Sequence, residues 1–211
     1  MIAVEQYVVG MVSTNCYFVI HKETKEVIVI DPGASADKLA AILRDKGYQA
    51  KAILLTHGHS DHAGGVEQLK KEFADEELTV YANEEEQETL LQPSLNLSAE
   101  ITGHSQSYQV DEFLRDKEER TIGGMHFQMI STPGHTSGGC CYYFPEECIL
   151  FSGDSLFCGS IGRTDFPGGS MSVLIHSIKS KLFNLPDCVV VYPGHEDMTT
   201  IEQEKKYNIY F

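Results

Sequence analysis

Short apolar runs separated by turn-forming residues predict the β-strands of this chain. Residues 2–9, 16–20 and 26–30 are rich in Val, Ile, Tyr and Phe, and Gly, Asn, Lys and Thr separate them, which is typical of strands joined by tight turns. Apolar runs of similar length predict further strands over residues 52–56, 126–130, 141–144, 148–151 and 189–192. The chain therefore opens with consecutive strands and returns to strands along its whole length.

Helical periodicity appears between these runs. Leu39, Ile42 and Leu43 recur at helical spacing after Ser35, and Gly47 marks the end of this helix. The same spacing predicts helices over Val66, Leu69 and Phe73, over Leu174, Ile178 and Leu182, and after the caps Thr199 and Thr200. Because strands and helices interleave without a linker or repeat, we expect an α/β fold in one domain, residues 1–211, with sheets covered by helices.

One segment lacks both patterns. Residues 92–120 are polar and poorly periodic. We interpret them as a long surface loop and a candidate lid, because irregular loops of this length in compact domains are usually functional.

Charge and composition exclude several classes of function. The formal net charge of −15 repels a phosphate backbone, so we expect no nucleic-acid substrate. No apolar run approaches the ~20 residues that cross a bilayer, and residues 1–5 lack the positive charge of a secretion signal. We therefore expect a cytoplasmic protein with no membrane association. The six cysteines form no C-x-x-C pair, and we interpret them as buried free thiols.

Four of the predicted strands run into turns that deliver potential metal ligands. The strand at 52–56 leads into the run His-Gly-His-Ser-Asp-His, and the strands at 126–130, 148–151 and 189–192 each lead to one further His or Asp beside a glycine. These candidate ligands are His57, His59, Asp61, His62, His135, Asp154 and His195. Strand ends packed in one layer lie near one another, so the four turns can converge on one point.

The residue types at this point favour a centre with two metal ions. In an extended loop, residues two apart face the same way, so His57 and His59 can bind one ion while Asp61 and His62 turn toward a second. A carboxylate between two ions can bridge them, and Asp154 is the natural bridge. Imidazole and carboxylate ligands suit zinc, iron or manganese. We expect two divalent ions, with zinc as the first choice and iron or manganese as alternatives.

Residues around the ligands have supporting roles in this hypothesis. Asp31, before Pro32 and Gly33, either orients a ligand by a hydrogen bond or simply forms a turn. A helix beginning near Gly64 would direct its positive end at the site and favour the charged form of Asp61. The remaining histidines lack a comparable context, and we interpret them as surface or ordinary structural residues: His21, His104, His126 and His176.

The order of these motifs resembles the metallo-β-lactamase superfamily. The string Thr-His-Gly-His-Ser-Asp-His at residues 56–62 is followed by Pro-Gly-His at 133–135, Gly-Asp at 153–154 and Pro-Gly-His at 193–195. The resemblance implies an αβ/βα sandwich of two mixed β-sheets flanked by helices, with the metal site at one edge. It also implies that His57, His59 and His135 hold the first ion, that Asp61, His62 and His195 hold the second, and that Asp154 contacts both.

Within that superfamily the chain looks like the glyoxalase II branch, which has a histidine at the position of His62 and an aspartate at that of Asp154. Residues 153–168 are similar to the short bacterial type II glyoxalases, which hydrolyse S-D-lactoylglutathione and related thioesters. Those enzymes usually carry proline where Ile209 stands. Longer relatives bind the glutathione tail through a helical extension, whereas only 16 residues follow His195 here, so the thiol carrier stays open.

The resulting hypothesis is a cytoplasmic hydrolase that cleaves a small-molecule thioester with a metal-bridging hydroxide. Coordination lowers the pKa of water from about 15.7 toward ~7, so a nucleophile exists at neutral pH. Asp61 and Asp154 are the predicted catalytic residues, since Asp61 can orient the nucleophile or accept its proton and Asp154 joins the ions. Arg163 either binds a substrate carboxylate or braces its loop through Asp165, and we favour the bracing role.

Two alternatives remain at this stage. A persulfide dioxygenase shares the histidine motif and the Gly-Arg-Thr-Asp-Phe string at 162–166, and it would hold one iron through His57, His135 and Asp154. The Pro-Gly-His string before residue 196 and the glycines after Phe166 favour hydrolysis instead. A non-catalytic metal-binding module is the other alternative, but structural zinc sites are usually closed and rich in cysteine.

Overall fold

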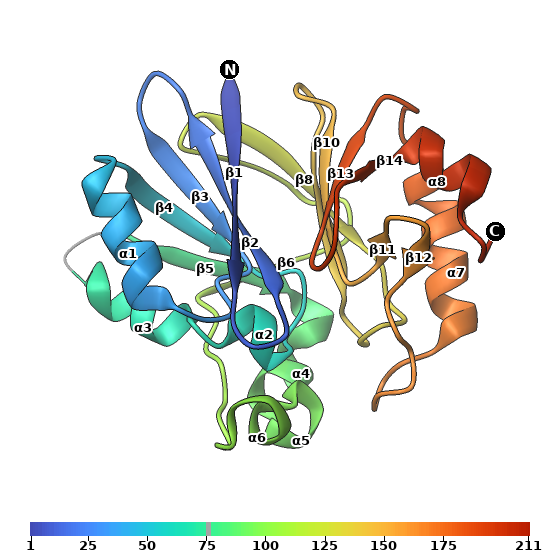
Figure 1. Ribbon diagram of the computed structural model, residues 1–211, viewed down its shortest axis with the longest axis horizontal. Helices are drawn as coiled ribbons and strands as arrows, with labels where there is room; N and C mark the ends of the chain where they lie inside the picture. Colours follow the sequence, from blue (N-terminus) through green and yellow to red (C-terminus); the bar gives the residue numbers. More distant parts are fainter. Residues whose placement is uncertain (75–76) are drawn as a thin grey trace.

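The structure is a computed structural model that describes residues 1–74 and 77–211. Its N-terminal half builds a mixed six-stranded sheet in the order β1-β2-β3-β4-β5-β6 (Figure 1). The first three strands pair antiparallel and the last four parallel. The strands are β1 (Ile2–Val9), β2 (Thr14–His21), β3 (Glu26–Ile30), β4 (Gln49–Leu54), β5 (Thr79–Asn83) and β6 (Glu112–Leu114).

The C-terminal half builds a second six-stranded sheet in the order β14-β13-β10-β9-β8-β7, in which β10 and β13 are parallel and the other pairs antiparallel. Its strands are β7 (Glu119–Ile122), β8 (Met125–Ser131), β9 (Cys140–Phe144), β10 (Ile149–Gly153), β13 (Val190–Pro193) and β14 (Thr199–Thr200). A small hairpin of β11 (Leu156–Phe157) and β12 (Ser160–Ile161) follows β10.

Helices cover the outer faces of both sheets. In Figure 1, α1 (Ala36–Asp45) and α3 (Val66–Glu72) lie outside the first sheet, and α7 (Met171–Ser180) and α8 (Ile201–Tyr207) lie outside the second. The order of layers is helices, sheet, sheet, helices. The αβ/βα sandwich that the resemblance implied is therefore confirmed.

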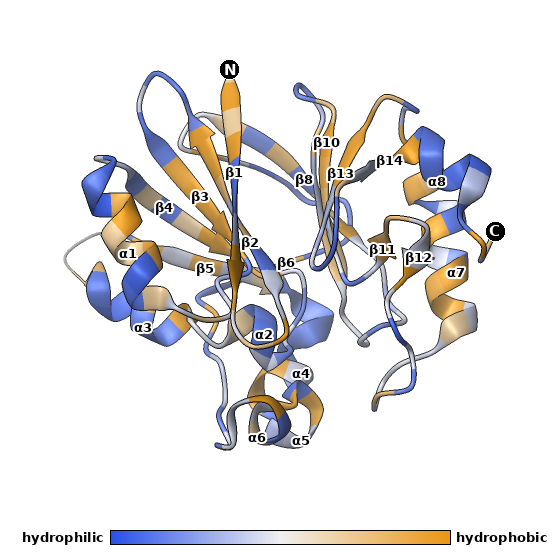
Figure 2. Cartoon of the chain, in the orientation of Figure 1, coloured by the Kyte–Doolittle hydropathy of each residue, from blue (hydrophilic) through white to orange (hydrophobic). Residues whose placement is uncertain are grey.

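Burial on both faces explains why the central strands are almost continuously apolar. Along β2, Phe18 packs toward α1 and α3, whereas Tyr17 and Val19 pack into the layer between the sheets. Successive side chains of a strand point to opposite faces, so both faces need apolar residues when both are covered. Figure 2 shows apolar colouring along much of β3 and β13, polar colouring over much of α3 and α8, and a largely apolar α7.

Several predicted elements differ from the structure. β4 ends at Leu54, so residues 55–56 belong to the turn that leads to the metal-ligand run. The helix expected near Gly64 is preceded by a short helix, α2 (Ser60–Ala63), which places Asp61 in its first turn. The predicted helix through Leu182 ends at Ser180, and a 3₁₀ turn, η2 (Leu182–Asn184), follows. The strand β5 was not predicted.

The prediction of a long loop over residues 92–120 is wrong. This stretch contains α5 (Pro93–Asn96), α6 (Ser98–Thr102), β6 and the beginning of β7. The buried Asn96 folds the segment, because its Nδ2 donates to the carbonyls of Leu90 and Gln106 and its Oδ1 accepts from the Ser98 amide. Side-chain hydrogen bonds of this kind leave no apolar periodicity in the sequence.

The remaining structural expectations have mixed outcomes. The six cysteines are free, but Cys158 and Cys188 are exposed and Cys148 is only partly buried, so the prediction of buried thiols is correct for Cys16, Cys140 and Cys141. None of the helices in the described part of the chain has the length and apolar character needed to cross a membrane.

Candidate metal centre

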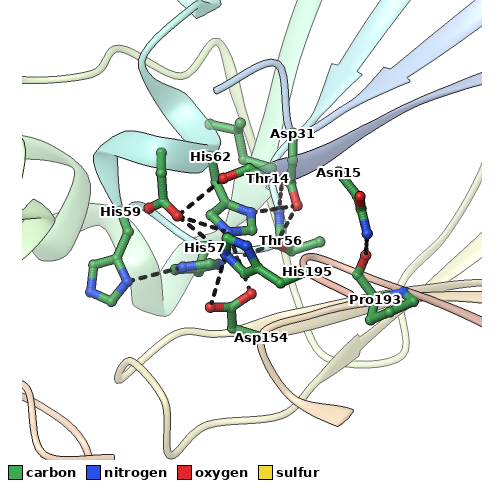
Figure 3. A network of polar contacts seen from close by, with 12 residues as sticks. Thr14, Asn15, Asp31, Thr56, His57, His59, His62, Asp154, Pro193 and His195 are labelled. Atoms are coloured by element: carbon green, nitrogen blue, oxygen red, sulfur yellow. Dashed lines mark hydrogen bonds and ion pairs between the residues drawn. The ribbon is translucent and has the colours of Figure 1, made fainter. Parts of the chain in front are cut away.

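The seven predicted ligands meet at one edge of the sandwich, where strands from both sheets end. His57 and His59 lie in the turn after β4, and Asp61 and His62 lie in α2. The turns after β8, β10 and β13 supply the other three: His135, Asp154 and His195. Figure 3 shows His57, His62, Asp154 and His195, which come from separate elements, gathered at one point.

Three overlapping groups have ligand atoms within 4.8 Å of one another. The first is His57, His59 and His135, and another is Asp61, His62 and His195. The third, His57, His62 and Asp154, spans the two. The grouping agrees with the two three-residue sets and the shared aspartate that the resemblance implied. We call His57, His59 and His135 the histidine group, and we call Asp61, His62 and His195 the mixed group.

The histidine group is buried, and its ring nitrogens face one another. His59 Nδ1 lies 3.0 Å from His57 Nε2 and 3.0 Å from His135 Nε2. Burial lowers the pKa of His57 well below its usual range and lowers that of His59 to about 3, so both rings are neutral near pH 7. Neutral imidazoles with converging lone pairs are the form that binds a metal ion.

The mixed group adds negative charge. Asp61 Oδ2 lies 3.2 Å from His195 Nε2 and 3.6 Å from His62 Nε2. Burial opposes a charge on His62, but Asp61, Asp31 and Asp154 outweigh it and raise its pKa well above the usual range. Burial likewise opposes a charge on Asp61, but His62 and His195 lower its pKa. This group therefore favours a cation more strongly than neutral histidines alone.

Asp154 lies between the two groups. One of its carboxylate oxygens is 3.5 Å from His135 Nε2 and 3.7 Å from His195 Nε2, and the other is 3.4 Å from His62 Nε2. Burial opposes its charge, but the neighbouring His62 and His135 hold its pKa well below the usual range. Among the described residues, Asp154 Oδ1 and His59 Nε2 are buried side-chain atoms without a hydrogen-bond partner. The orphaned Asp154 oxygen lies among the ligand side chains and fits a divalent metal ion, whereas His59 faces the histidine group through Nδ1, so its Nε2 is not a ligand atom of that group.

Asp31 orients this centre and also forms a turn. Its carboxylate accepts hydrogen bonds from the amide and hydroxyl of Thr56, at 2.8 and 2.6 Å, and contacts His62 Nδ1 at 2.9 Å. Because the Asp31 carboxylate contacts His62 Nδ1, it holds the imidazole ring so that His62 Nε2 faces the other ligands. The Gly33 amide also donates to the Asp31 carbonyl, so both interpretations of this residue hold.

Two glycines allow the backbone to approach the ligands. A Cβ on Gly194 would lie 2.4 Å from Asp154 Oδ1 and 2.6 Å from His62 Cε1. Gly153 has a φ of +49°, and a Cβ there would lie 2.3 Å from Thr56 Oγ1. A larger residue at position 194 would collide with Asp154 and His62, and one at position 153 would collide with Thr56 and would also need a strained backbone.

Strand β2 contacts the mixed group through residues that sequence reasoning missed. Asn15 Nδ2 donates to the carbonyls of Pro193 and Glu196, at 3.0 and 2.9 Å, and the Tyr17 hydroxyl donates to Pro193 at 2.7 Å (Figure 3). These bonds clamp the turn that carries His195. The available signal was an asparagine directly before the apolar run at residues 16–20, since a buried amide needs hydrogen-bond partners.

A cavity of about 570 Å³ opens onto the ligands. His59, Asp61, His135, Asp154 and His195 form its floor. Its walls are largely apolar and come from Val12, Leu97, Ile101, Phe157, Ile161 and Phe166. Leu97 and Ile101 belong to the segment predicted as a loop, which therefore contributes to the cavity as part of the helical structure.

Arg163 lies at the edge of this cavity and pairs with Asp165. Its Nε and a terminal nitrogen donate to the two carboxylate oxygens at 2.7 and 2.6 Å, and its guanidinium carbon lies 4.0 Å from the centre of the Phe166 ring. The Arg163 carbonyl also lies 2.6 Å from His135 Nδ1. These contacts agree with the interpretation that Arg163 braces its loop through Asp165.

The other histidines lie outside the three ligand groups. His21 contacts Thr24, and His126 Nε2 lies 3.5 Å from Glu119. His104 and His176 are exposed. Their interpretation as surface or structural residues agrees with these positions.

Comparisons with known proteins agree with this geometry. The hydroxyacylglutathione hydrolase GloC of Haemophilus influenzae is 37% identical, over 92% of this chain and 91% of its own length. The crystal structure of BLEG-1, a B3 metallo-beta-lactamase, superposes with a TM-score of 0.92 at 38% identity over 99% of each chain. TTHA1623, solved in a di-iron-bound form, gives 0.83 at 33% identity over 98% of this chain and 100% of its own.

The family model for the metallo-beta-lactamase superfamily matches residues 9–195, which includes every ligand described above. The chain belongs to the metallo-beta-lactamase superfamily, and its clustered His and Asp side chains form the metal-binding site of a metallo-hydrolase.

Proposed function

We propose that this protein hydrolyses a small-molecule hydroxyacyl thioester, such as S-D-lactoylglutathione, at a centre of two divalent metal ions. The observation that carries the proposal is the pair of ligand groups joined by Asp154 at the floor of an apolar-walled cavity. The name of the similar GloC enzyme supports the substrate class. Zinc is the expected metal, and the di-iron form of TTHA1623 makes iron the first alternative.

The residues have distinct roles in this proposal. His57, His59 and His135 would hold one ion, Asp61, His62 and His195 the other, and Asp154 both. Bound ions supply Lewis acidity and lower the pKa of water toward ~7. Asp61 holds its carboxylate at the cavity floor, where it can accept a proton, and Thr14 Oγ1 orients it from 3.2 Å. The apolar walls hold the acyl group, and a thiolate leaves without a strong general acid.

Within the mixed group, His195 favours hydrolysis over the persulfide dioxygenase alternative, because Asp61 and His62 belong to the histidine motif that both classes share. A single iron would need only His57, His135 and Asp154. The structure also places Asp61, His62 and His195 within mutual ligand distance. A second complete ligand group supports two ions.

The similarity to BLEG-1 makes β-lactam hydrolysis the second candidate function. A β-lactam and a thioester both present a carbonyl carbon to a nucleophile, so one centre can serve either substrate. Their leaving groups differ, because an amine must be protonated and a thiolate need not be.

The test is a parallel assay of one preparation on S-D-lactoylglutathione, other thioesters and a cephalosporin, with metal content measured on the same sample. We expect the highest kcat/KM on a thioester, with two metal ions per chain. Faster cleavage of the cephalosporin would replace the proposal with the second candidate. One iron per chain with sulfite formed from a thiol persulfide would support the dioxygenase instead, and bound metal without any turnover would support a binding module.

A further inference from the structure

Glu86 is a buried carboxylate that no step of the proposed reaction uses. It ends a short 3₁₀ turn, η1 (Glu84–Glu86), that leads into α4 (Gln87–Leu91), and it is 1% exposed. The neighbouring Glu84, Glu85 and Glu88 are exposed. A glutamate is rarely buried in this way without a specific role.

The carboxylate of Glu86 joins two loops that carry metal ligands. Oε1 accepts a hydrogen bond from the Gly58 amide at 2.9 Å. Oε2 accepts from the Thr136 hydroxyl at 2.9 Å and from the Gly138 amide at 2.7 Å. Gly58 stands between His57 and His59, and Thr136 follows His135. The three histidines of the histidine group are therefore adjacent in sequence to residues that Glu86 holds.

The chain segments around these bonds approach one another so closely that neither Gly58 nor Gly138 has free space for a Cβ. A Cβ added to Gly138 would lie 2.2 Å from the Glu86 amide nitrogen, and one added to Gly58 would lie 3.0 Å from the Leu90 amide nitrogen. Asn83 Nδ2 donates to the Gly138 carbonyl at 2.9 Å. The corner formed by η1 and α4 thus contacts both loops directly.

The Gly58 amide, the Thr136 hydroxyl and the Gly138 amide all donate hydrogen bonds to Glu86, so both of its carboxylate oxygens act as acceptors. Burial raises the pKa of Glu86 to about 7, and the bonds from Gly58, Thr136 and Gly138 oppose that rise. A glutamine has one acceptor and one donor end, so its NH₂ would face a donor on one side and leave that loop unpaired.

We propose that Glu86 is a positioning residue that sets the spacing of the two loops and thereby the metal affinity of the histidine group, while leaving the mixed group unaffected. The inference rests on the two-ion centre proposed above. The mixed group has a support of its own in Asn15, which Glu86 does not contact. Asp31 contacts His62 of the mixed group and also Thr56 beside His57, so it supports both groups.

Glu204 supplies a matched control. It lies in α8, is also 1% exposed, and accepts hydrogen bonds from Gly159, Thr199 and Asn208 at 2.9, 2.6 and 2.7 Å. None of these partners is adjacent to a predicted ligand in the sequence. Replacing either glutamate by glutamine therefore disturbs a similar buried network, but only Glu86 contacts the ligand loops.

The experiment compares Glu86→Gln, Glu204→Gln and wild type by titrating Zn²⁺-loaded protein with a competing chromogenic chelator, with thermal unfolding measured on the metal-free proteins. We expect Glu86→Gln to weaken one ion by about 10- to 100-fold, the range for residues that support metal ligands. The second ion should keep its wild-type affinity, and Glu204→Gln should keep both, although both variants lower the unfolding temperature.

Two ligand variants assign the weakened ion. In a His195→Ala background, which keeps the three histidines of the histidine group, Glu86→Gln should cause the same loss. In a His135→Ala background it should cause none, because the positioned group is already broken. Should Glu86→Gln fail to fold, Glu86→Asp, which keeps both acceptors but is one methylene shorter, should give a smaller loss in the same ion.

Wild-type affinity for both ions in Glu86→Gln, or equal losses in Glu86→Gln and Glu204→Gln, would overturn the role of Glu86. A wild-type protein that binds one ion in total would instead contradict the two-ion centre. In that case the affinities of wild type, Glu86→Gln and Glu204→Gln for the single bound ion would still be compared.

Discussion

The two ligand groups of the metal centre differ in charge, exposure and support. The histidine group consists of three buried imidazoles, and the corner before α4 holds its loops through Glu86. The mixed group contains Asp61, its His195 side chain is 21% exposed, and β2 holds it through Asn15. A single short run after β4 serves both groups. If the proposed two-ion centre is correct, one loop serves two different metal environments because different neighbouring elements support each side.

The largest expected effect comes from removing Asp154, the residue that lies between the two ligand groups. Asp154→Ala should release both ions and lower kcat/KM on a thioester by at least about 10³-fold, comparable to other catalytic-group deletions. Elemental analysis and a thioester assay on one sample measure both effects. Asp187→Asn, an exposed aspartate paired with Lys205, is the control and should keep both properties. Wild-type metal content and turnover in Asp154→Ala would refute the bridging role.

A smaller effect is expected on the mixed group alone. Asn15→Ala leaves the Glu196 carbonyl without its donor and leaves the Pro193 carbonyl with the Tyr17 hydroxyl alone, so it should lower the free energy of unfolding by about 1–3 kcal/mol. It should also weaken one ion by about 10-fold or more, and this should be the ion that Glu86→Gln leaves unchanged.

Chemical denaturation and the chelator titration described for Glu86 measure these changes. Asn184→Ala, which removes an exposed asparagine bonded to Ser180, is the matched control. If Asn15→Ala and Glu86→Gln weaken the same ion, the two groups are not supported separately.

The smallest effect tests the role of Arg163 at the cavity edge. If Arg163 braces its loop through Asp165, Arg163→Gln and Asp165→Asn break the same contact and should raise KM equally. The rise should be no more than about 5-fold, since exposed ion pairs contribute about 0.2–1 kcal/mol. If Arg163 binds a substrate carboxylate, Arg163→Gln should raise KM much more, whereas Asp165→Asn should lower it. Steady-state kinetics on S-D-lactoylglutathione separate the two outcomes.

The sequence was sufficient to predict which His and Asp side chains cluster and more than half of the strands, because both depend on local pattern. Each ligand follows an apolar strand, and strand ends in one layer converge. The burial of Glu86 could not be predicted from the sequence, because this residue lies among exposed glutamates and only its tertiary contacts distinguish it from them. Asn96 was missed for a similar reason, because its hydrogen bonds to Leu90 and Gln106 depend on how the chain folds back.

The bond from Asn15 to Pro193 joins residues 178 positions apart. During synthesis the chain emerges from its N-terminus, at about 5–20 residues per second, so β2 is exposed well before β13 exists. The histidine group needs only residues up to His135, whereas the mixed group needs His195 as well. A nascent chain therefore contains every residue of the histidine group before it contains those of the mixed group, and the complete centre can form only after β13 and the turn that follows it have been synthesised.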